Sequence, residues 1–260
     1  RRVHGGIRKF VLPNNKTTMG AISAAIGDAI MTCLWVFCAS SFGLIASTLT
    51  TALGLQANAI ANICIITNVI FIFVFIFGFI GTALGGASFN PCATAAFYVA
   101  GVGGDSLFTM AIRFPAQAVG AVTGVSSLMF LLPPEYKSEI SGPTLKVDLH
   151  TGALAEGLLT FSITFAVLVI ILKGPKNMIV QSWLLAVATI VFVLAGAGYT
   201  GPSMNPSNAF GWAYFNKKHD SLDHFYVYWV CPFVGAILAA LLFRVVFPQP
   251  KPKKKKQKKA

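Results

Sequence analysis

Long apolar stretches alternate with short polar connections along the chain, and each stretch is bounded by Pro, Gly or charged residues. The apolar stretches lie at about 21–47, 60–84, 107–132, 152–172, 178–197 and 226–247. A helix needs about 20 apolar residues to cross a bilayer, so each stretch predicts one membrane-spanning helix. The polar connection 133–150 divides the six predicted spans into three and three.

The composition supports this pattern. Apolar residues make up 55% of the 260 residues and charged residues only 11%, whereas soluble domains carry about 25% charged residues. Segments 29–104 and 177–216 contain no Asp, Glu, Lys or Arg. Inside lipid, a helix satisfies the hydrogen bonds of its own backbone, so such long uncharged segments fit a helical bundle. The sequence therefore predicts an all-α, six-transmembrane protein embedded in the lipid bilayer.

The net charge of +12 is concentrated at the two ends of the chain. Seven of the twenty Lys and Arg residues lie in 251–260, and five precede residue 17. Basic patches are also typical of nucleic-acid binding, but these flank a hydrophobic body, so we expect no nucleic-acid partner. The positive-inside rule explains them better and predicts that both termini are cytoplasmic, which an even number of spans allows.

No catalytic or metal-binding constellation is evident. The five cysteines fall mostly in apolar stretches without CxxC or CxxH spacing, which favours buried apolar side chains over disulfides or metal ligands. The four histidines form no cluster in the sequence. We therefore expect no enzyme, no cofactor and no metal.

The chain divides into five segments. It begins without Met and its strong apolar pattern starts at Met19, so residues 1–18 are interpreted as an extension before a natural start, outside the folded body. The other expected segments are a first repeat at 19–132, a connecting loop at 133–150, a second repeat at 151–247 and a Lys-rich cytoplasmic tail at 248–260.

Two Asn-Pro stretches indicate the repeat. "NPCATAAFYVAG" begins at Asn90 and "NPSNAFGWAYFN" at Asn205; each follows a span and is too short to cross a membrane. Asn suits a helix N-cap and Pro the first helical position, so the stretches predict half-helices at 90–99 and 205–214. With three spans per half, the two copies enter from opposite faces. Such an inverted repeat with broken helices is typical of transport proteins.

The two half-helices would meet near the membrane midplane with their N-termini facing each other. Each Asn oxygen would cap its own helix while the NH₂ group points into the lumen as a donor. Two such donors would orient a passing water oxygen and interrupt a proton wire. Each half-helix end also adds about +0.5 charge, which repels cations.

Asp28 and Glu156 are the two acidic residues within the predicted spans, and they align in "AIGDAIMT" and "ALAEGLLT". An acidic side chain inside a span is costly, so it is either functional or paired. We interpret both as structural carboxylates that accept backbone N–H bonds from a re-entrant loop. Ionisable groups on the path of a coupled transporter are the alternative.

Small residues recur four positions apart, as close packing between membrane helices requires. The pairs are Gly81 and Gly85, Gly120 and Gly124, and Gly235 and Ala239. We expect these residues to make packing contacts rather than ligand contacts.

The paired motifs, with "GYTGPSMNPSNAFG" (198–211), "FPAQAVGAVTG" (114–124) and "YWVCPFVGAILA" (228–239), resemble the aquaporins, or major intrinsic proteins. The basic tail, the altered motifs and "MGAISAAIGDA" are similar to the plant small basic intrinsic proteins in particular. The resemblance implies an aquaporin-like bundle with two re-entrant half-helices in inverted repeat, assembled as a homotetramer with one pore per subunit. The pore motif would comprise Asn90, Pro91, Cys92, Asn205, Pro206 and Ser207.

Departures from the family pattern bear on selectivity. Both motifs usually end in Ala, where this chain has Cys92 and Ser207, and Asn208 stands where water-selective members carry an Arg. Carried over by position, the outer constriction would be formed by Ile70, Val193, Pro202 and Asn208. Such a filter is aliphatic and uncharged, which leaves strict water selectivity open. The Cys92 thiol, next to the pore motif, is expected to be reachable by mercurials.

The tail ends in "KKQKKA", which places Lys256 and Lys258 at the spacing of a dilysine-type retrieval signal. The resemblance accordingly implies residence in the endoplasmic-reticulum membrane, with lipid binding by the basic tail as the alternative use of these residues. The sequence as a whole predicts a passive channel for water, with small neutral solutes as further permeants. The alternatives are a solute channel with little water selectivity, a coupled secondary transporter, and a membrane scaffold acting through its Lys-rich tail.

Overall fold

A computed structural model describes residues 18–248, so the expectations for the N-terminal extension, Lys256 and Lys258 lie outside the described residues. Within 18–248 the chain forms helices and turns without any strand. The α-helices are α1 (Thr18–Ala39), α2 (Phe42–Ala52), α3 (Ala59–Ala83), α4 (Pro91–Val99), α5 (Leu107–Leu131), α6 (Pro134–Lys137), α7 (Leu149–Leu172), α8 (Met178–Gly196), α9 (Pro206–Phe215), α10 (Leu222–Phe225) and α11 (Cys231–Val246). One π-helical turn, η1 (Tyr226–Val230), lies between α10 and α11.

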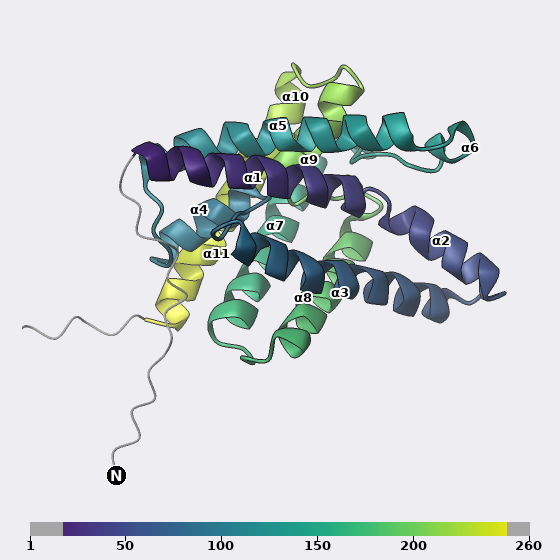
Figure 1. Ribbon diagram of the computed structural model, residues 1–260, viewed down its shortest axis with the longest axis horizontal. Coiled ribbons are helices and arrows are strands. Elements are labelled where there is room, and N and C mark those ends of the chain that lie inside the picture. The colour runs from purple at the N-terminus through teal and green to yellow at the C-terminus, as the bar shows by residue number, and fades with distance from the viewer. Residues whose placement is uncertain (1–17, 249–260) are drawn as a thin grey trace, which may run out of the picture.

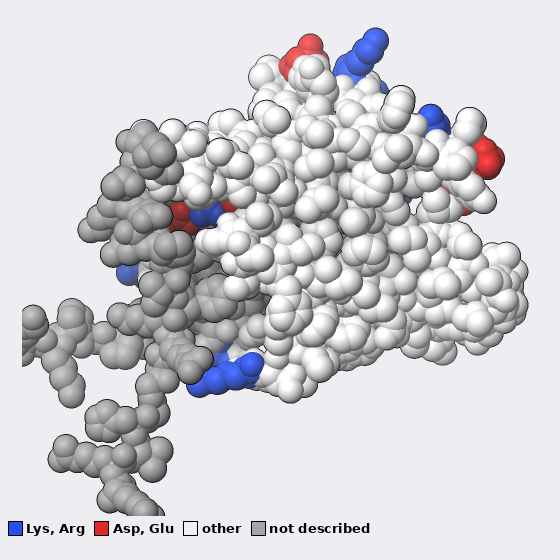
Figure 2. Space-filling view, viewed as in Figure 1, with Lys and Arg blue, Asp and Glu red and all other residues white. Residues whose placement is uncertain are grey.

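Six helical segments of the described chain are long and apolar enough to cross a membrane, which confirms the predicted fold class. They are Gly20–Ala52, Ala59–Ala83, Leu107–Leu131, Leu149–Leu172, Met178–Gly196 and Leu222–Val246. Figure 2 shows charged side chains gathered toward two ends of the visible face, with a broad band between them that carries none. An uncharged band of this kind suits the hydrocarbon region of a bilayer.

The first span differs from the single stretch 21–47 expected from the sequence. It consists of α1 and α2, which are separated at Ser40 and Ser41. The Ser41 hydroxyl donates to the carbonyl oxygen of Phe37 at 3.1 Å, and the Ser40 hydroxyl accepts from the Trp212 indole at 3.2 Å. Serine side chains that compete for backbone and tertiary partners favour a break in a helix. The span therefore bends here and continues to Ala52.

Two helix crossings repeat between the halves of the molecule: α1 packs along α5, and α7 packs along α11 (Figure 1). A Cβ added at Gly120 would overlap the carbonyl oxygen of Ala29, and one at Gly235 would overlap the carbonyl oxygen of Gly157. Ala29 directly follows Asp28, and Gly157 directly follows Glu156. Glycine is therefore required at matching points of the two crossings because the backbones touch there.

The other small residues follow this pattern with one exception. A Cβ at Gly124 would lie 2.5 Å from the Cys33 carbonyl oxygen, and one at Gly81 would lie 3.3 Å from the Ala87 carbonyl oxygen. Gly85 was expected to pack as well, but a Cβ there would meet no atom within 4 Å. Gly85 instead has φ +74°, so it serves the turn after α3, where a left-handed conformation favours glycine.

The half-helices α4 and α9 have 9 and 10 residues, too few to cross a bilayer. Each packs against a helix of the other half of the chain, α4 on α11 and α9 on α5, and the two also touch each other. The start of α1 and the end of α11 lie at the same end of the molecule (Figure 1). The fold thus interlocks its two halves through their short helices.

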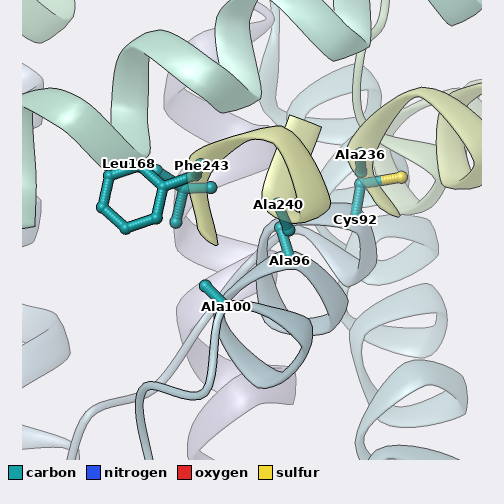
Figure 3. Close-up of a cluster of buried hydrophobic side chains, with 7 residues drawn as sticks. All are labelled: Cys92, Ala96, Ala100, Leu168, Ala236, Ala240 and Phe243. Carbon is teal, nitrogen blue, oxygen red and sulfur yellow. The ribbon is translucent and has the colours of Figure 1, made fainter. Parts of the chain in front are cut away.

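One buried apolar cluster secures α4 (Figure 3). Its members are Cys92, Ala96, Ala100, Leu168, Ala236, Ala240 and Phe243. Most of these side chains are small, which lets α4 approach α11 closely. The cluster therefore determines which face of α4 packs against α11.

Candidate functional site

Each of the two predicted Asn residues caps a half-helix. The Asn90 Oδ1 atom accepts a hydrogen bond from the backbone N–H of Cys92 at 2.9 Å, at the start of α4. At the start of α9, the Asn205 Oδ1 atom accepts from the N–H groups of Ser207 at 3.1 Å and Asn208 at 3.4 Å. Each Asn is followed by Pro in the first helical turn, where a missing N–H costs nothing.

The two caps also bind each other's loops. The Asn90 Nδ2 atom donates to the carbonyl oxygen of Met204 at 2.9 Å, and the Asn205 Nδ2 atom donates to the carbonyl oxygen of Phe89 at 2.9 Å. Each acceptor is the residue directly before the opposite Asn. The N-termini of α4 and α9 therefore face each other, and each amide retains a second N–H beyond this bond.

The Glu156 carboxylate, on α7, organises the loop that leads into α9. It is fully buried and accepts from the Thr200 hydroxyl at 2.9 Å and from the backbone N–H groups of Ser203 at 2.8 Å and Met204 at 3.0 Å. Met204 has φ +49°, a left-handed conformation that is uncommon for a side chain of its size. Glu156 holds the N–H of Met204 and Asn90 holds its carbonyl, which keeps this strained residue in place.

The Asp28 carboxylate, on α1, has the corresponding position in the first half. It is fully buried and accepts from the backbone N–H of Ser88 at 2.8 Å and from the Gln117 amide at 2.7 Å. Ser88 and Ser203 each lie two residues before a capping Asn. The two carboxylates thus bind matching points of the two re-entrant loops.

Arg113, on α5, completes the Asp28 site and was missed in the sequence. Its Nε and Nη2 atoms donate to the two Asp28 oxygens at 2.7 and 2.8 Å, and its Nη1 atom lies 2.8 Å from both Asp105 oxygens. A signal was available, because Arg113 is the one cation within the predicted span 107–132. A charge inside a span needs a partner, and Asp28 was a candidate.

The motif residues Cys92 and Ser207 are both fully buried. Cys92 packs in the cluster of Figure 3 near Ala236, so its thiol does not reach solvent, contrary to the expected access for mercurials. The physical reason is the close contact of α4 with α11, which covers that face of the short helix. The Ser207 hydroxyl has no hydrogen-bond partner among the described residues.

The four residues expected at the outer constriction lie on the helix pair α3 and α8 and around the start of α9. Ile70, on α3, is buried in an apolar cluster, and Val193 is half-buried on α8, which packs against α3. Pro202 lies in the loop that leads into α9 and Asn208 in the first turn of α9, where the Asn208 amide donates to the Ser203 hydroxyl at 3.3 Å. The Asn208 side chain is therefore bound to its own loop.

The described part of the chain contains neither a metal-binding cluster nor a disulfide. No three His, Cys, Asp or Glu side chains within 18–248 lie together as metal ligands would. All five cysteines, which fall in this range, are free.

The sequence matches the family model "Major intrinsic protein" over residues 15–243. Aquaporin SIP1-1 of Arabidopsis thaliana is 54% identical over 93% of this chain and 100% of the relative. Aquaporin SIP1-1 of rice, Oryza sativa subsp. japonica, is 52% identical over 92% of this chain and 99% of the relative. Probable aquaporin SIP2-1 of Arabidopsis thaliana is more distant, at 29% identity over 93% of this chain and 98% of the relative.

Among solved structures, the fold is similar to that of the aquaglyceroporin from Plasmodium falciparum, with a TM-score of 0.69. The alignment has 21% sequence identity and covers 88% of this chain and 98% of the aquaglyceroporin. At that identity the likeness concerns the fold alone.

Six apolar spans with two half-helices joined at their N-termini define a multi-pass membrane channel of the passive kind, not an enzyme. Such a channel handles water or small solutes. The chain belongs to the major intrinsic protein family, the aquaporins, and within it to the plant small basic intrinsic proteins.

Proposed function

We propose that the protein conducts water, with small neutral solutes as further permeants, through one pore per subunit at the junction of α4 and α9. The observation that carries this proposal is the reciprocal binding of Asn90 to Met204 and of Asn205 to Phe89. It brings two amide donors and two helix N-termini to one point of the fold. A water oxygen at that point would accept from the second N–H of each amide.

This geometry also supports a barrier to protons and cations. A water that accepts from Asn90 and Asn205 has both hydrogens directed away from the junction, so a chain of waters cannot pass a proton through it. The positive ends of α4 and α9 disfavour a cation at the same point. Asp28 and Glu156 hold loops through several hydrogen bonds each, which favours a structural role over ion coupling.

We propose that Ile70, Val193, Pro202 and Asn208 set the outer selectivity. None of them is charged, and the Asn208 amide is bound to Ser203. A constriction without a fixed cation would admit neutral solutes according to size and would add little to cation exclusion. Asn208→Arg should therefore lower the permeability to urea and glycerol more than the permeability to water.

For the assembly we propose a homotetramer in the endoplasmic-reticulum membrane, with both termini cytoplasmic. The start of α1 and the end of α11 lie at one end of the molecule, which supports a common side for the termini (Figure 1). Lys256 and Lys258 would then face the cytosol for retrieval. Replacing both with Ala should move a fluorescent fusion out of the endoplasmic reticulum, and an unchanged distribution would contradict the retrieval role.

Stopped-flow light scattering on proteoliposomes tests the proposed permeation. Wild-type protein should pass water with a low activation energy, and parallel runs with glycerol, urea and hydrogen peroxide give the range of permeants. Asn205→Ala should reduce water flux at least tenfold, as an order-of-magnitude expectation for a lost ordering contact.

Asn177→Ala is the matched control for that variant. The Asn177 side chain caps α8 by accepting from the N–H groups of Ile179 at 2.9 Å and Val180 at 3.2 Å, and neither bond involves a half-helix. Loss of this cap should cost about 1 kcal/mol of stability and leave water flux unchanged. Equal flux in Asn205→Ala and wild type would overturn the proposed role of the junction.

A further inference from the structure

Arg113 is a buried cation whose guanidinium binds two carboxylates. Its side chain is 6% exposed and forms ion pairs with Asp28 at 2.7 Å and with Asp105 at 2.8 Å. The guanidinium binds the two Asp28 oxygens through Nε and Nη2 and the two Asp105 oxygens through Nη1. Such bidentate, charge-assisted bonds are among the strongest that side chains form.

The two carboxylates are connected to the chain before and after the first half-helix. Asp28 binds the N–H of Ser88 at 2.8 Å, on the loop that enters α4. Asp105 lies on the loop that leaves α4, next to Ser106, the N-cap of α5. The Arg113 guanidinium is therefore linked to both ends of the re-entrant segment 88–105.

Among the residues that the structure describes, the second half of the molecule has no such link. Gly120 and Gly235 mark matching points of the two helix crossings, and the residues seven positions before them are Arg113 and Tyr228. The Tyr228 hydroxyl donates only to the Thr200 carbonyl, at 3.2 Å, on the loop that enters α9. A neutral hydroxyl thus stands where the first half has a cation, and it reaches one end of its loop.

Of the two ion pairs of Arg113, the one with Asp105 is the more accessible to solvent. Arg113 and Asp105 line a cavity of about 100 Å³ together with Ser23, Thr109 and the turn at Gly85. Asp105 is 13% exposed, whereas Asp28 is fully enclosed. The outer ion pair is therefore the part of the link that can be altered with the least disturbance of the core.

We propose that Arg113 is a positioning residue for permeation: it clamps the entry and the exit of the first re-entrant segment and so fixes the depth of Asn90 at the junction. This inference rests on the proposed function, because it takes the junction to be the point of permeation. A lysine in its place would supply the charge but not the planar fork, and would serve one carboxylate at a time. The second half-helix depends on this clamp only through the Asn90–Met204 bond, because Glu156 anchors its loop directly.

Hydrogen–deuterium exchange of the full chain in lipid nanodiscs tests the clamp independently of flux. Asp105→Asn and Arg113→Lys should each raise the exchange of amides 86–90 and 101–105 by about tenfold, as expected for partial loss of a charge-assisted contact. Amides 198–204 should change much less, because Glu156 holds the N–H groups of Ser203 and Met204 directly. Tyr228→Phe is the matched variant and should give the opposite pattern, with faster exchange at 198–204 alone.

Water flux of the same variants in proteoliposomes completes the test. Asp105→Asn and Arg113→Lys should each lower flux about threefold or more, and their double variant should be no worse than either alone, because both break one link. Exchange at 86–90 and 101–105 that stays at the wild-type rate in both variants would overturn the clamp. Faster exchange with unchanged flux would instead count against permeation at Asn90, and so against the proposed function.

Discussion

The side-chain amide of Asn90 lies 2.9 Å from the carbonyl oxygen of Met204, which is 114 residues away in the chain. Met204 directly precedes Asn205, whose own amide binds the carbonyl of Phe89 at 2.9 Å. Each cap therefore holds its own half-helix through its oxygen and the opposite half-helix through its nitrogen. Neither α4 nor α9 can shift along the junction without breaking a hydrogen bond of the other.

The two buried carboxylates should respond differently to the loss of their charge. Glu156→Gln replaces one acceptor oxygen with an NH₂ group, which cannot accept from the N–H of Met204 or Ser203, and this should cost about 1–3 kcal/mol. Asp28→Asn removes the inner partner of the buried Arg113, a change that costs about 3–5 kcal/mol in buried pairs, with Asp105 keeping it near the lower limit. Thermal unfolding in detergent measures both. Greater destabilisation by Glu156→Gln would contradict this ranking.

Because the helix backbones touch at the crossings, replacing glycine there should destabilise the protein. Gly120→Ala should destabilise the protein by about 1–3 kcal/mol, because its Cβ would overlap the carbonyl oxygen of Ala29 and push α1 away from α5. Gly43→Ala is the control: its Cβ would meet no atom within 4 Å in the first turn of α2, so it should change stability by less than about 0.5 kcal/mol. Unfolding temperatures of the two variants give the comparison.

The buried position of Cys92 makes a prediction about mercurials. Because its side chain is fully buried against α11, Cys92→Ala should leave any inhibition of water flux by mercury compounds unchanged. Cys64, which is exposed on α3, should be the first thiol labelled. Mass spectrometry of the labelled protein identifies which cysteine carries the label. Protection of flux from mercury by Cys92→Ala would show that α4 turns its thiol toward the permeant.

Asp148 gives the protein a pH-dependent helix cap outside the membrane spans. Its carboxylate accepts from Thr151 at the start of α7, and these hydrogen bonds hold the pKa of Asp148 below its usual value. A lowered folded-state pKa means that the cap stabilises fully above the unfolded-state pKa and is lost as pH falls through the folded-state value.

Wild type should therefore unfold at a higher temperature than Asp148→Ala at neutral pH, and the two should converge in strong acid. Unfolding temperatures of both proteins across the acidic range measure this difference. A gap that stays constant down to pH values below the range of carboxylates would show that the charge of Asp148 has no part in the cap.

The six spans and the caps of the two half-helices followed from the sequence because both depend on near neighbours in the chain. A run of apolar residues predicts a span whatever surrounds it, and Asn before Pro predicts a helix start from its own capping chemistry. Asn90 and Asn205 do cap α4 and α9, and six spans are present among the described residues. The break at Ser40 was missed because it depends on Trp212, which lies 172 residues away.

By itself, the sequence determined which segments are long enough to cross the membrane, which are too short and where the charges lie, since these are properties of local composition. Only the tertiary structure decided the partners: Arg113 for Asp28, 85 residues apart, and the opposite loops for the two Asn amides. It also decided that Cys92 faces α11. The reason is physical: a helix leaves its rotation about its own axis undetermined, and close packing at Gly120 and Gly235 selects one rotation for each crossing.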